Sequence, residues 1–288
     1  MDIFGEIARL RREGRRCALA TVVATNGPAP GYEGAKMLIR EDGSIAGTIG
    51  GGSVEAQVIA AAQQVIETGK SQRLAFSLGA ETLDEGHPIC GGEMEVFVEP
   101  ILPRPVAFIF GGGHVGKSIS QVANLAGFAT VIVDDREEFA NRRRFPEADE
   151  VFATAYEEVF SKLPINESSF LIIVTRGHKD DLRVLRLAVG SPAKYVAMIG
   201  SRRKVAEIVR ALENEGLPRM ALERIYAPMG LAIGAVTPEE IAVSVVAEMI
   251  AVRRNAGSNW RALSMSLFSK GEKEGDQNES GRHNPGCG

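Results

Sequence analysis

Residues 106–136 of this 288-residue chain read VAFIFGGGHVGKSISQVANLAGFATVIVDDR, and this stretch decides the fold class. The apolar run Val106–Phe110 opens into a glycine-rich turn, a helix-like segment follows, and a β-branched run then ends at Asp134. This order of strand, glycine turn, helix, strand and acid is typical of a nucleotide-binding βαβ unit of the Rossmann type. The alternative is a glycine-rich packing turn that holds no ligand.

The three spaced glycines of this motif are predicted to have different roles. Gly111 permits the tight turn, Gly113 lets the backbone approach a phosphate, and Gly116 lets the helix lie close to the strand. His114 follows at the mouth of the predicted phosphate site, so it is a candidate ligand contact through hydrogen bonding or, when protonated, through charge. The alternative for His114 is a helix-start residue that points to solvent.

The segment Asp134-Asp135-Arg136 ends the second strand and belongs to the same candidate cofactor site. Asp134 lies where a carboxylate meets a ribose hydroxyl, whereas the arginine could take a phosphate. The alternative is that Arg136 pairs with one of its acidic neighbours. The residues leave both interpretations of Arg136 open.

The whole chain is predicted to be an α/β protein, in which a C-terminal Rossmann-type parallel-sheet domain follows a smaller α+β domain. We expect the α+β domain over residues 1–100, the Rossmann-type domain over 105–254, and a polar, disordered tail over 255–288. Glu99–Pro105 contains three prolines and is predicted to be the linker. Further strands of the second domain, short and apolar as a parallel sheet covered on both faces requires, are predicted near 150–153, 170–175 and 195–199.

The last predicted helix has a strong start signal and almost no polar face. Thr237-Pro238-Glu239-Glu240 forms a capping box with a proline in the first turn. The segment Ile241–Arg253 that follows is apolar nearly all round, interrupted only by Ser244 and Glu248. Such a helix must be buried, either against the sheet or in a subunit interface, and we therefore expect a homodimer.

Composition excludes several classes of protein. The net charge of −4 gives no electrostatic reason to expect a nucleic-acid partner. No segment is long and apolar enough to span a bilayer, and the N-terminus lacks the apolar core of a signal peptide. The three cysteines lie far apart and do not suggest a disulfide framework, so a reducing cytoplasm is the expected location.

Four further segments carry candidate site residues. His178 follows the predicted strand 170–175 and could bind metal with its neighbouring acids, shuttle a proton or bind a ligand. Arg202 begins a cationic cluster after the next strand and suits an anion.

In the first domain, a second glycine-rich strand-to-helix turn comprises Gly50, Gly51, Gly52 and Glu55; a tight packing turn is the alternative there. Cys90, beside two glycines, could present a thiolate to a soft metal.

Taken together, the residues resemble the XdhC/CoxI family of xanthine dehydrogenase accessory factors up to residue 254. The segments that carry the resemblance, in order, are GAKMLI (34–39), GTIGGGSVE (47–55), CGGEMEVFVEP (90–100), GGGHVGKS…DDR (111–136), VTRGHKDD (174–181), MIGSRRK (198–204) and GLAIGAVTPEEIAVSVVAEMIAVRR (230–254). Each segment is weak evidence by itself, but the ordered series is specific.

The resemblance implies a non-enzymatic accessory factor that binds molybdenum cofactor, in its molybdopterin form or as a dinucleotide. It would promote the sulfuration of the cofactor and its insertion into a xanthine dehydrogenase-type molybdenum hydroxylase. Its partners would be the apo-enzyme and a sulfur-supplying cysteine desulfurase, with Cys90 near the metal. NAD(P) or another nucleotide could fill the Rossmann site, so an NAD(P)-dependent oxidoreductase and a nucleotide-sensing regulatory module remain the alternatives.

Overall fold

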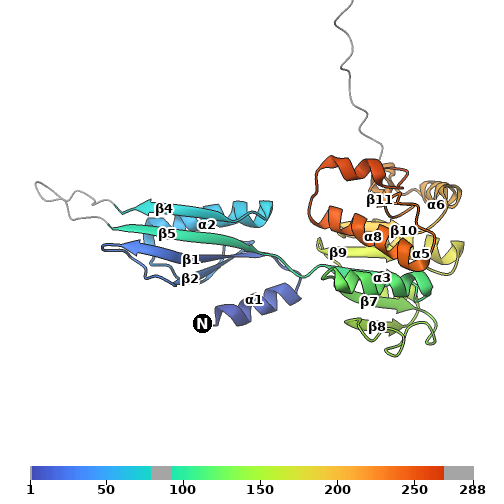
Figure 1. The fold of residues 1–288 in the computed structure, drawn as a ribbon, viewed down its shortest axis with the longest axis horizontal. Coiled ribbons are helices and arrows are strands. Elements are labelled where there is room, and N and C mark those ends of the chain that lie inside the picture. The colour runs from blue at the N-terminus through green and yellow to red at the C-terminus, as the bar shows by residue number, and fades with distance from the viewer. Residues whose placement is uncertain (1, 79–91, 269–288) are drawn as a thin grey trace, which may run out of the picture. The chain divides into compact units, whose positions relative to one another are not determined.

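The computed structural model describes residues 2–78 and 92–268 of the chain. The chain divides into two compact units: Met1–Pro105 with Asn166–Ser168, and Val106–Ile165 with the residues from Ser169 onward. Each unit has its own sheet and its own core, and each is described by itself below (Figure 1).

The first unit is built on an antiparallel sheet of five strands. Their spatial order is β3 (Ile45–Gly47), β2 (Lys36–Arg40), β1 (Cys17–Asn26), β5 (Glu93–Ile101) and β4 (Gln72–Ser77). The central strand β1 pairs with β2 on one side and with β5 on the other. The predicted linker from Glu99 is therefore shorter than expected, because β5 continues through Pro100 to Ile101 in pairing with Cys17 and Ala18 of β1.

Two helices cover opposite faces of this sheet. In β2, Met37 and Ile39 face the core beneath α2 (Gly52–Thr68), whereas Leu38 packs in a separate cluster with Leu10 of α1 (Ile3–Arg12). Successive residues of a strand point to opposite faces, so this alternation divides the apolar side chains between the two helices. The period of two in the sequence thus specifies an α/β/α sandwich.

The second unit is built on a parallel sheet of six strands. Their spatial order is β11 (Ile225–Tyr226), β10 (Tyr195–Met198), β9 (Ser169–Ile173), β6 (Val106–Phe110), β7 (Ala129–Asp134) and β8 (Glu150–Ala153). Read from β8, this is the order 3-2-1-4-5-6 of a doubly wound dinucleotide-binding fold. The α/β fold class is confirmed. The strand order reverses between β6 and β9, where such folds bind their ligands.

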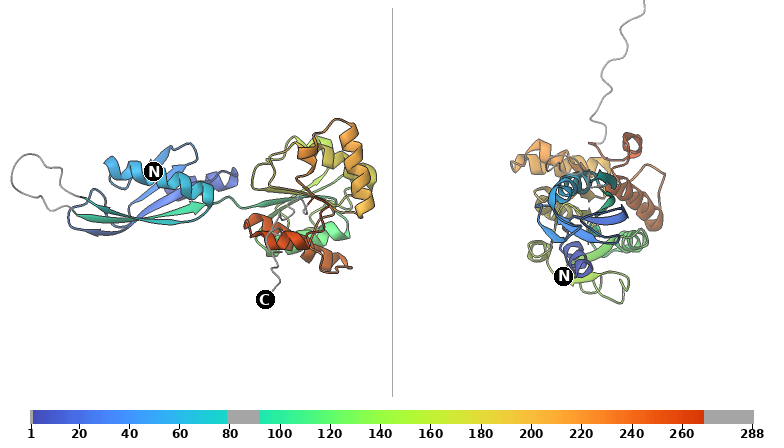
Figure 2. Two further views of the ribbon diagram at one scale, coloured as in Figure 1. Left: turned by 90° about the horizontal axis from the view of Figure 1, so that it is seen from above. Right: turned by 90° about the vertical axis from the view of Figure 1, so that its left-hand side faces the viewer.

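Helices cover both faces of the parallel sheet (Figure 2). On one face, α3 (His114–Leu125) and α8 (Pro238–Arg253) pack against Ala107 and Ile109 of β6. On the other face, Phe108 and Phe110 of β6 join a second core. That core receives side chains from the helices α4 (Tyr156–Phe160), α5 (His178–Val189), α6 (Arg202–Asn214) and α7 (Arg219–Leu222).

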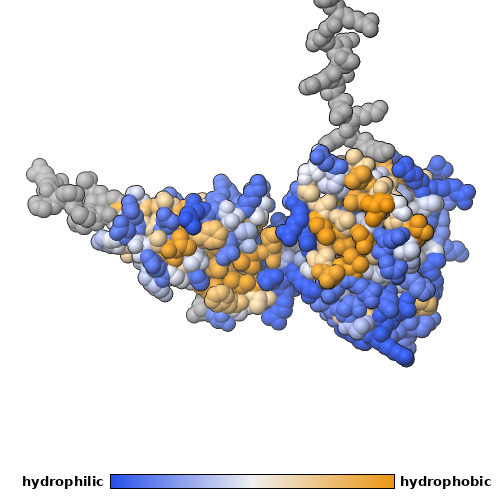
Figure 3. Space-filling view, viewed as in Figure 1, coloured by the Kyte–Doolittle hydropathy of each residue, from blue (hydrophilic) through white to orange (hydrophobic). Residues whose placement is uncertain are grey.

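The apolar helix α8 is buried mainly within its own unit. Its predicted capping box at Thr237 and Glu240 is present, and the two polar residues in its middle, Ser244 and Glu248, are both buried. Glu248 accepts hydrogen bonds from Tyr195, Gly230 and Ser264, which ties the helix to the sheet. Val243 of α8 is half exposed. Figure 3 shows apolar residues gathered on the face of the second unit where α8 lies. The homodimer stays a prediction.

The tail expected to be disordered from residue 255 begins with ordered structure. Residues Ser258–Leu263 form a short 3-10 helix, in which the Trp260 ring stacks on Tyr226 with 6.3 Å between the centroids. The backbone N–H of Met265 then donates to the carbonyl of Gly230. The polar composition of this segment did not predict that it packs against the edge strand β11, because only a few of its residues make the packing contacts.

Within residues 2–78 and 92–268, no helix is long and apolar enough to cross a membrane.

Candidate functional site

Three glycines of the β6–α3 turn are required by close backbone packing. Gly111 has φ +120°, and a Cβ added there would lie 2.2 Å from the carbonyl oxygen of Val174, which follows β9. A Cβ on Gly112 would lie 2.1 Å from the carbonyl oxygen of Phe139, and one on Gly116 would lie 2.0 Å from that of Gly111. Side chains at these positions would push the turn away from the sheet. The glycines therefore hold the start of α3 at the point where the strand order reverses.

Gly113 differs from its neighbours because the fold does not need a glycine there. Its φ is −64°, and a Cβ added to it would meet no atom within 4 Å in the described part of the chain. As the N-cap residue of α3, it supplies no side chain to the free N–H groups of the first helical turn. His114 follows as the first helical residue and is exposed. This open, uncapped helix start has the geometry of an anion site.

Asp134 is fully buried at the end of β7, and donors of its own unit surround its carboxylate. Oδ2 accepts from the backbone N–H of Gly112 at 2.8 Å and from Nη2 of Arg136 at 3.0 Å. Oδ1 accepts from the backbone N–H and the Nε of Arg136, at 3.2 Å and 2.9 Å. The alternative in which Arg136 pairs with an acidic neighbour is therefore the one observed. The contact of Asp134 with a ribose stays a prediction.

These contacts control the charge of both partners. Burial works to raise the pKa of Asp134, but the hydrogen bonds from Arg136 and Gly112 outweigh it, so the pKa lies below its ordinary value. The hydrogen bond to Asp134 raises the pKa of Arg136 in turn. The pair is thus a carboxylate and a guanidinium at any pH near neutrality. The Arg136 guanidinium also lies 3.7 Å above the ring of Phe139.

Arg144 joins this site, although no sequence motif singles it out. Its Nε donates to the carbonyl of Gly112 at 2.8 Å, and its guanidinium lies 5.4 Å from the Phe139 ring centroid. Its Nη2 is buried and has no hydrogen-bond partner among the described residues. The run Arg142-Arg143-Arg144 was the only signal in the sequence, and a run of like charges ordinarily indicates a solvated surface.

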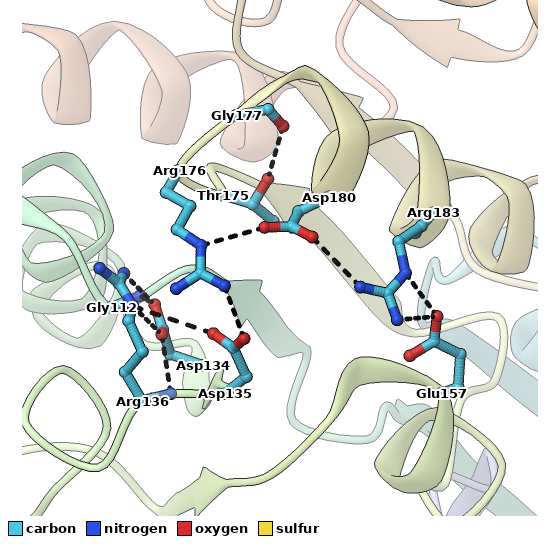
Figure 4. Close-up of polar contacts among 10 residues, drawn as sticks. All are labelled: Gly112, Asp134, Asp135, Arg136, Glu157, Thr175, Arg176, Gly177, Asp180 and Arg183. Atoms are coloured by element: carbon cyan, nitrogen blue, oxygen red, sulfur yellow. Dashed lines mark hydrogen bonds and ion pairs between the residues drawn. The ribbon is translucent and has the colours of Figure 1, made fainter.

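A chain of alternating charges connects the ends of β7 and β9 (Figure 4). Arg176 bridges Asp135 at 2.8 Å and Asp180 at 3.2 Å, and Asp180 in turn contacts Arg183 at 3.3 Å. Glu157 of α4 accepts from Arg183 at 2.8 Å. Asp135 therefore lies at these strand ends as a partner of Arg176, and its contact with a cofactor stays a prediction. These side chains are partly exposed, so the main effect of the ion pairs is to orient them rather than to add stability.

The residues after β9 and β10 form a second, buried polar group. Asp181 accepts from the Thr175 hydroxyl at 2.6 Å and forms an ion pair with Lys204 of α6. Burial raises the pKa of Asp181 against the effect of both partners. His178 and Arg202 are exposed at the first positions of α5 and α6, so the structure places both at helix starts on the carboxyl edge of the sheet. Among the described residues, no group of three His, Cys, Asp or Glu side chains could hold a metal ion.

The glycine-rich turn of the first unit is built differently. Gly50 has φ +124°, and a Cβ there would lie 2.5 Å from the carbonyl carbon of Pro30. The Glu55 carboxylate accepts hydrogen bonds from the backbone N–H groups of Ile49 and Gly51, both at 3.0 Å, and from the Thr48 hydroxyl at 2.5 Å. Gly51 and Gly52 keep positive φ angles of +85° and +68°. A side chain of the unit thus occupies the anion position of this turn.

Cys90, the predicted metal ligand, lies outside the described residues, so its place relative to the Gly50–Gly52 turn stays a prediction. Cys17 is the free cysteine that the structure does describe. It is buried in the small core under α1, and burial raises the pKa of its thiol to about 11. Cys17 is therefore unsuited to act as a thiolate ligand.

Both units match known protein families. A family model described as the XdhC Rossmann domain matches residues 107–249, and one described as the XdhC and CoxI family matches residues 10–77. A solved structure described as a xanthine dehydrogenase from Bacillus halodurans aligns with 93% of this chain and 99% of its own, with a TM-score of 0.50 and 22% identity. That likeness concerns the fold alone.

Three curated relatives are similar in sequence. The uncharacterized protein YqeB of Escherichia coli K12 is 35% identical over 89% of this chain and 47% of its own length. A probable xanthine dehydrogenase subunit from Bacillus subtilis 168 is 29% identical over 55% of this chain and 46% of its own. The molybdenum cofactor insertion chaperone PaoD of E. coli K12 is 25% identical over 83% and 84%. The chain thus spans about half the length of YqeB and of the B. subtilis protein.

Proposed function

Because the chain belongs to the XdhC/CoxI family, we propose that it binds molybdenum cofactor and takes part in the maturation of a molybdenum enzyme. The relative named as a molybdenum cofactor insertion chaperone supports this role, since the similarity covers most of both chains. The observation in the molecule that carries the proposal is the uncapped start of α3 at Gly113, which is open to a phosphate group.

The proposed function in full is that of a maturation chaperone without an enzymatic activity of its own. It would hold the cofactor, as molybdopterin or as a dinucleotide, while sulfur is supplied by a cysteine desulfurase. It would then deliver the cofactor to the apo-form of a xanthine dehydrogenase-type hydroxylase. We propose that this takes place in the cytoplasm and that the chaperone acts as a homodimer.

The residues present at the Rossmann turn fit a phosphorylated ligand. The N–H groups at the start of α3 would bind a phosphate, because they point out of the helix and no side chain in the described part of the chain caps them. His114 lies at this helix start, and His178 and Arg202 begin α5 and α6, which cover the other face but start at the same edge of the sheet. These three side chains could contact the rest of the ligand. Arg144 adds a positive charge beside Gly112, and its Nη2 is buried without a partner among the described residues.

Cys90 is proposed as the ligand of molybdenum on the ground of its sequence. A thiolate is a soft, strong donor, and Cys90 is followed by two glycines in the sequence. The Gly50–Gly52 turn and Glu55 are proposed to lie on the same side of the cofactor. Because Glu55 already accepts from the turn, its backbone N–H groups would support this site indirectly rather than bind an anion.

The test is to isolate the full chain from cells that make molybdenum cofactor, without exposure to oxygen. Molybdenum is measured by mass spectrometry, and the pterin by the fluorescence of its oxidised form. We expect metal and pterin in equal, near-stoichiometric amounts. A protein that contains neither, but retains a nucleotide, would contradict the carrier function and favour a sensor or an oxidoreductase.

Cys90→Ala tests the metal ligand in the same preparation. We expect it to lower the retained molybdenum several-fold and to leave the melting temperature unchanged, and Cys287→Ala is the control. The activity of a client hydroxylase reconstituted with each variant provides a second readout. If Cys90→Ala retains as much molybdenum and activates the client as well as the unaltered chain, Cys90 has no part in the mechanism.

A further inference from the structure

We propose that the edge of the Rossmann turn at Asp134 and Arg136 recognises a phosphate monoester on the ligand's ribose rather than a ribose diol. The ligand class is therefore a nucleotide that carries an additional phosphate on its ribose. This inference rests on the proposed phosphate site at the start of α3, and it identifies what the neighbouring side chains select.

Asp134 has no acceptor position left for a ribose diol. A carboxylate has about four lone-pair positions and no proton to donate. Two backbone N–H groups and two guanidinium nitrogens already donate to it, at 2.8 to 3.2 Å. The side chain is also fully buried. A diol would have to displace one of these donors, so the carboxylate is a positioning group for Arg136 and Gly112 instead of a ligand contact.

Arg136 is held in a fixed orientation. Its Nε and Nη2 bind Asp134, and its guanidinium is held over the Phe139 ring, so the plane of the group is fixed. Its Nη1 makes no hydrogen bond to any described residue, and a quarter of the side chain is exposed. A guanidinium fixed in this way is suited to phosphate, whose oxygens accept its N–H groups in a planar arrangement.

Arg144 adds a second cation, and unlike Arg136 it has no carboxylate partner among the described residues. It binds a carbonyl oxygen and not a carboxylate, and its Nη2 lacks a partner among residues 2–78 and 92–268. Arg136 and Arg144 both lie against Phe139, and both are linked to Gly112. Arg136 is paired with the buried Asp134 and lies 3.8 Å from Asp135, which itself pairs with Arg176. No described carboxylate pairs with Arg144, so the charge of Arg144 is the one that an additional phosphate would compensate.

The competing possibility is that Asp135 binds a ribose diol. Its side chain is about one-third exposed, and its nearest approach to Arg136 is 3.8 Å. However, its Oδ2 already accepts from Arg176 at 2.8 Å. The geometry therefore favours Asp135 as the element that holds Arg176 across the strand ends. Comparing the affinities of two ligands that differ by one ribose phosphate distinguishes phosphate recognition at Arg136 from diol recognition at Asp135.

The experiment compares 5′-AMP with 2′,5′-ADP by calorimetry on the full chain. We expect 2′,5′-ADP to bind at least ten-fold more tightly, and Arg136→Ala to abolish this preference. The same variant should bind 5′-AMP no more weakly than the unaltered chain, because Asp134 regains free acceptor positions. Arg183→Ala is the matched control. It removes an arginine that pairs with Asp180 and Glu157, and it should keep the preference for 2′,5′-ADP.

Arg136→Lys guards against loss of the fold, since Arg136→Ala leaves the buried carboxylate without its cation. Lysine keeps the charge but not the planar pair of donors, so we expect an intermediate preference. Equal binding of the two nucleotides, or a loss of 5′-AMP binding in Asp135→Asn, would overturn the proposal. Failure of both nucleotides to bind would also overturn it. The carrier function would stand or fall separately, on the retained molybdenum and pterin.

Discussion

The two glycine-rich turns of this chain look alike in sequence and differ in what occupies their anion position. In the first unit, Glu55 reaches back from α2 and accepts the N–H groups of Ile49 and Gly51. In the second unit, the N-cap residue Gly113 has no side chain, and no described residue lies near its Cβ position, so the start of α3 is left open. A glycine-rich strand-to-helix turn is therefore not by itself a ligand site.

The difference also distinguishes the glycines that the fold requires from the glycine that we propose to serve a ligand. Gly50 and Gly111 both have φ near +120°, and at both a Cβ would collide with backbone atoms. Gly113 has an ordinary φ and open space around it. Because nothing in the described protein requires a glycine at position 113, the space beside it is the one that a bound phosphate would use.

Gly111→Ala should have the largest effect on stability, because it disrupts the backbone packing on which the glycine turn of the second unit depends. Its Cβ would meet the Val174 carbonyl oxygen in a left-handed backbone conformation, and we expect a loss of about 3 kcal/mol in the free energy of unfolding. Denaturant titration measures it. Gly190→Ala, at an open position with a negative φ in the same unit, should change that free energy by less than ~1 kcal/mol. Equal effects would refute the packing argument.

Gly113→Val should separate ligand binding from folding. The valine has room in the free protein but fills the space beside the helix start, so we expect nucleotide affinity to fall by at least about ten-fold, or ~1.4 kcal/mol. Stability should fall by only about 1 kcal/mol, because valine is a poorer N-cap residue than glycine but its Cβ collides with no described residue. Calorimetry and thermal unfolding give the two readouts, with Gly257→Val as the control at another open position. If the variant binds nucleotide as tightly as the unaltered chain, the ligand does not bind at this turn.

Glu55→Gln should have the smallest effect and should depend on pH. The hydrogen bonds from Thr48, Ile49 and Gly51 lower the pKa of Glu55 below 4.5, so the folded state favours the ionised form. Its contribution, about 1–2 kcal/mol, is present above the ordinary pKa and is lost as the pH falls through the lower folded value.

The stability difference between Glu55→Gln and the unaltered chain should therefore be greatest near neutral pH and should narrow below about pH 4. Chemical unfolding at several pH values measures it. Glu67→Gln, on an exposed position of the same helix, should cost less than ~0.5 kcal/mol at neutral pH. A gap for Glu55→Gln that does not vary with pH would contradict the capping role of its carboxylate.

Much of the fold was predictable because its signals are local. The β-branched runs predict β6, β7 and β9, and the capping box at Thr237 marks the start of α8. The prediction was wrong for residues 258–268, where Trp260 and Met265 join the second unit. A polar composition outweighed the few apolar residues there, and their partners lie at positions that sequence spacing does not reveal.

The sequence by itself determined the order of strands and helices, the two glycine turns and the family. Each of these depends on residues that are neighbours along the chain, and their periodicity and φ preferences act locally. Only the tertiary structure decided that Arg136 and Gly112 occupy Asp134, that Arg144 reaches Gly112, and that Lys204 pairs with Asp181. Most of these contacts join segments far apart in the chain, and a donor chooses among several acceptors only when packing has brought them within about 3 Å.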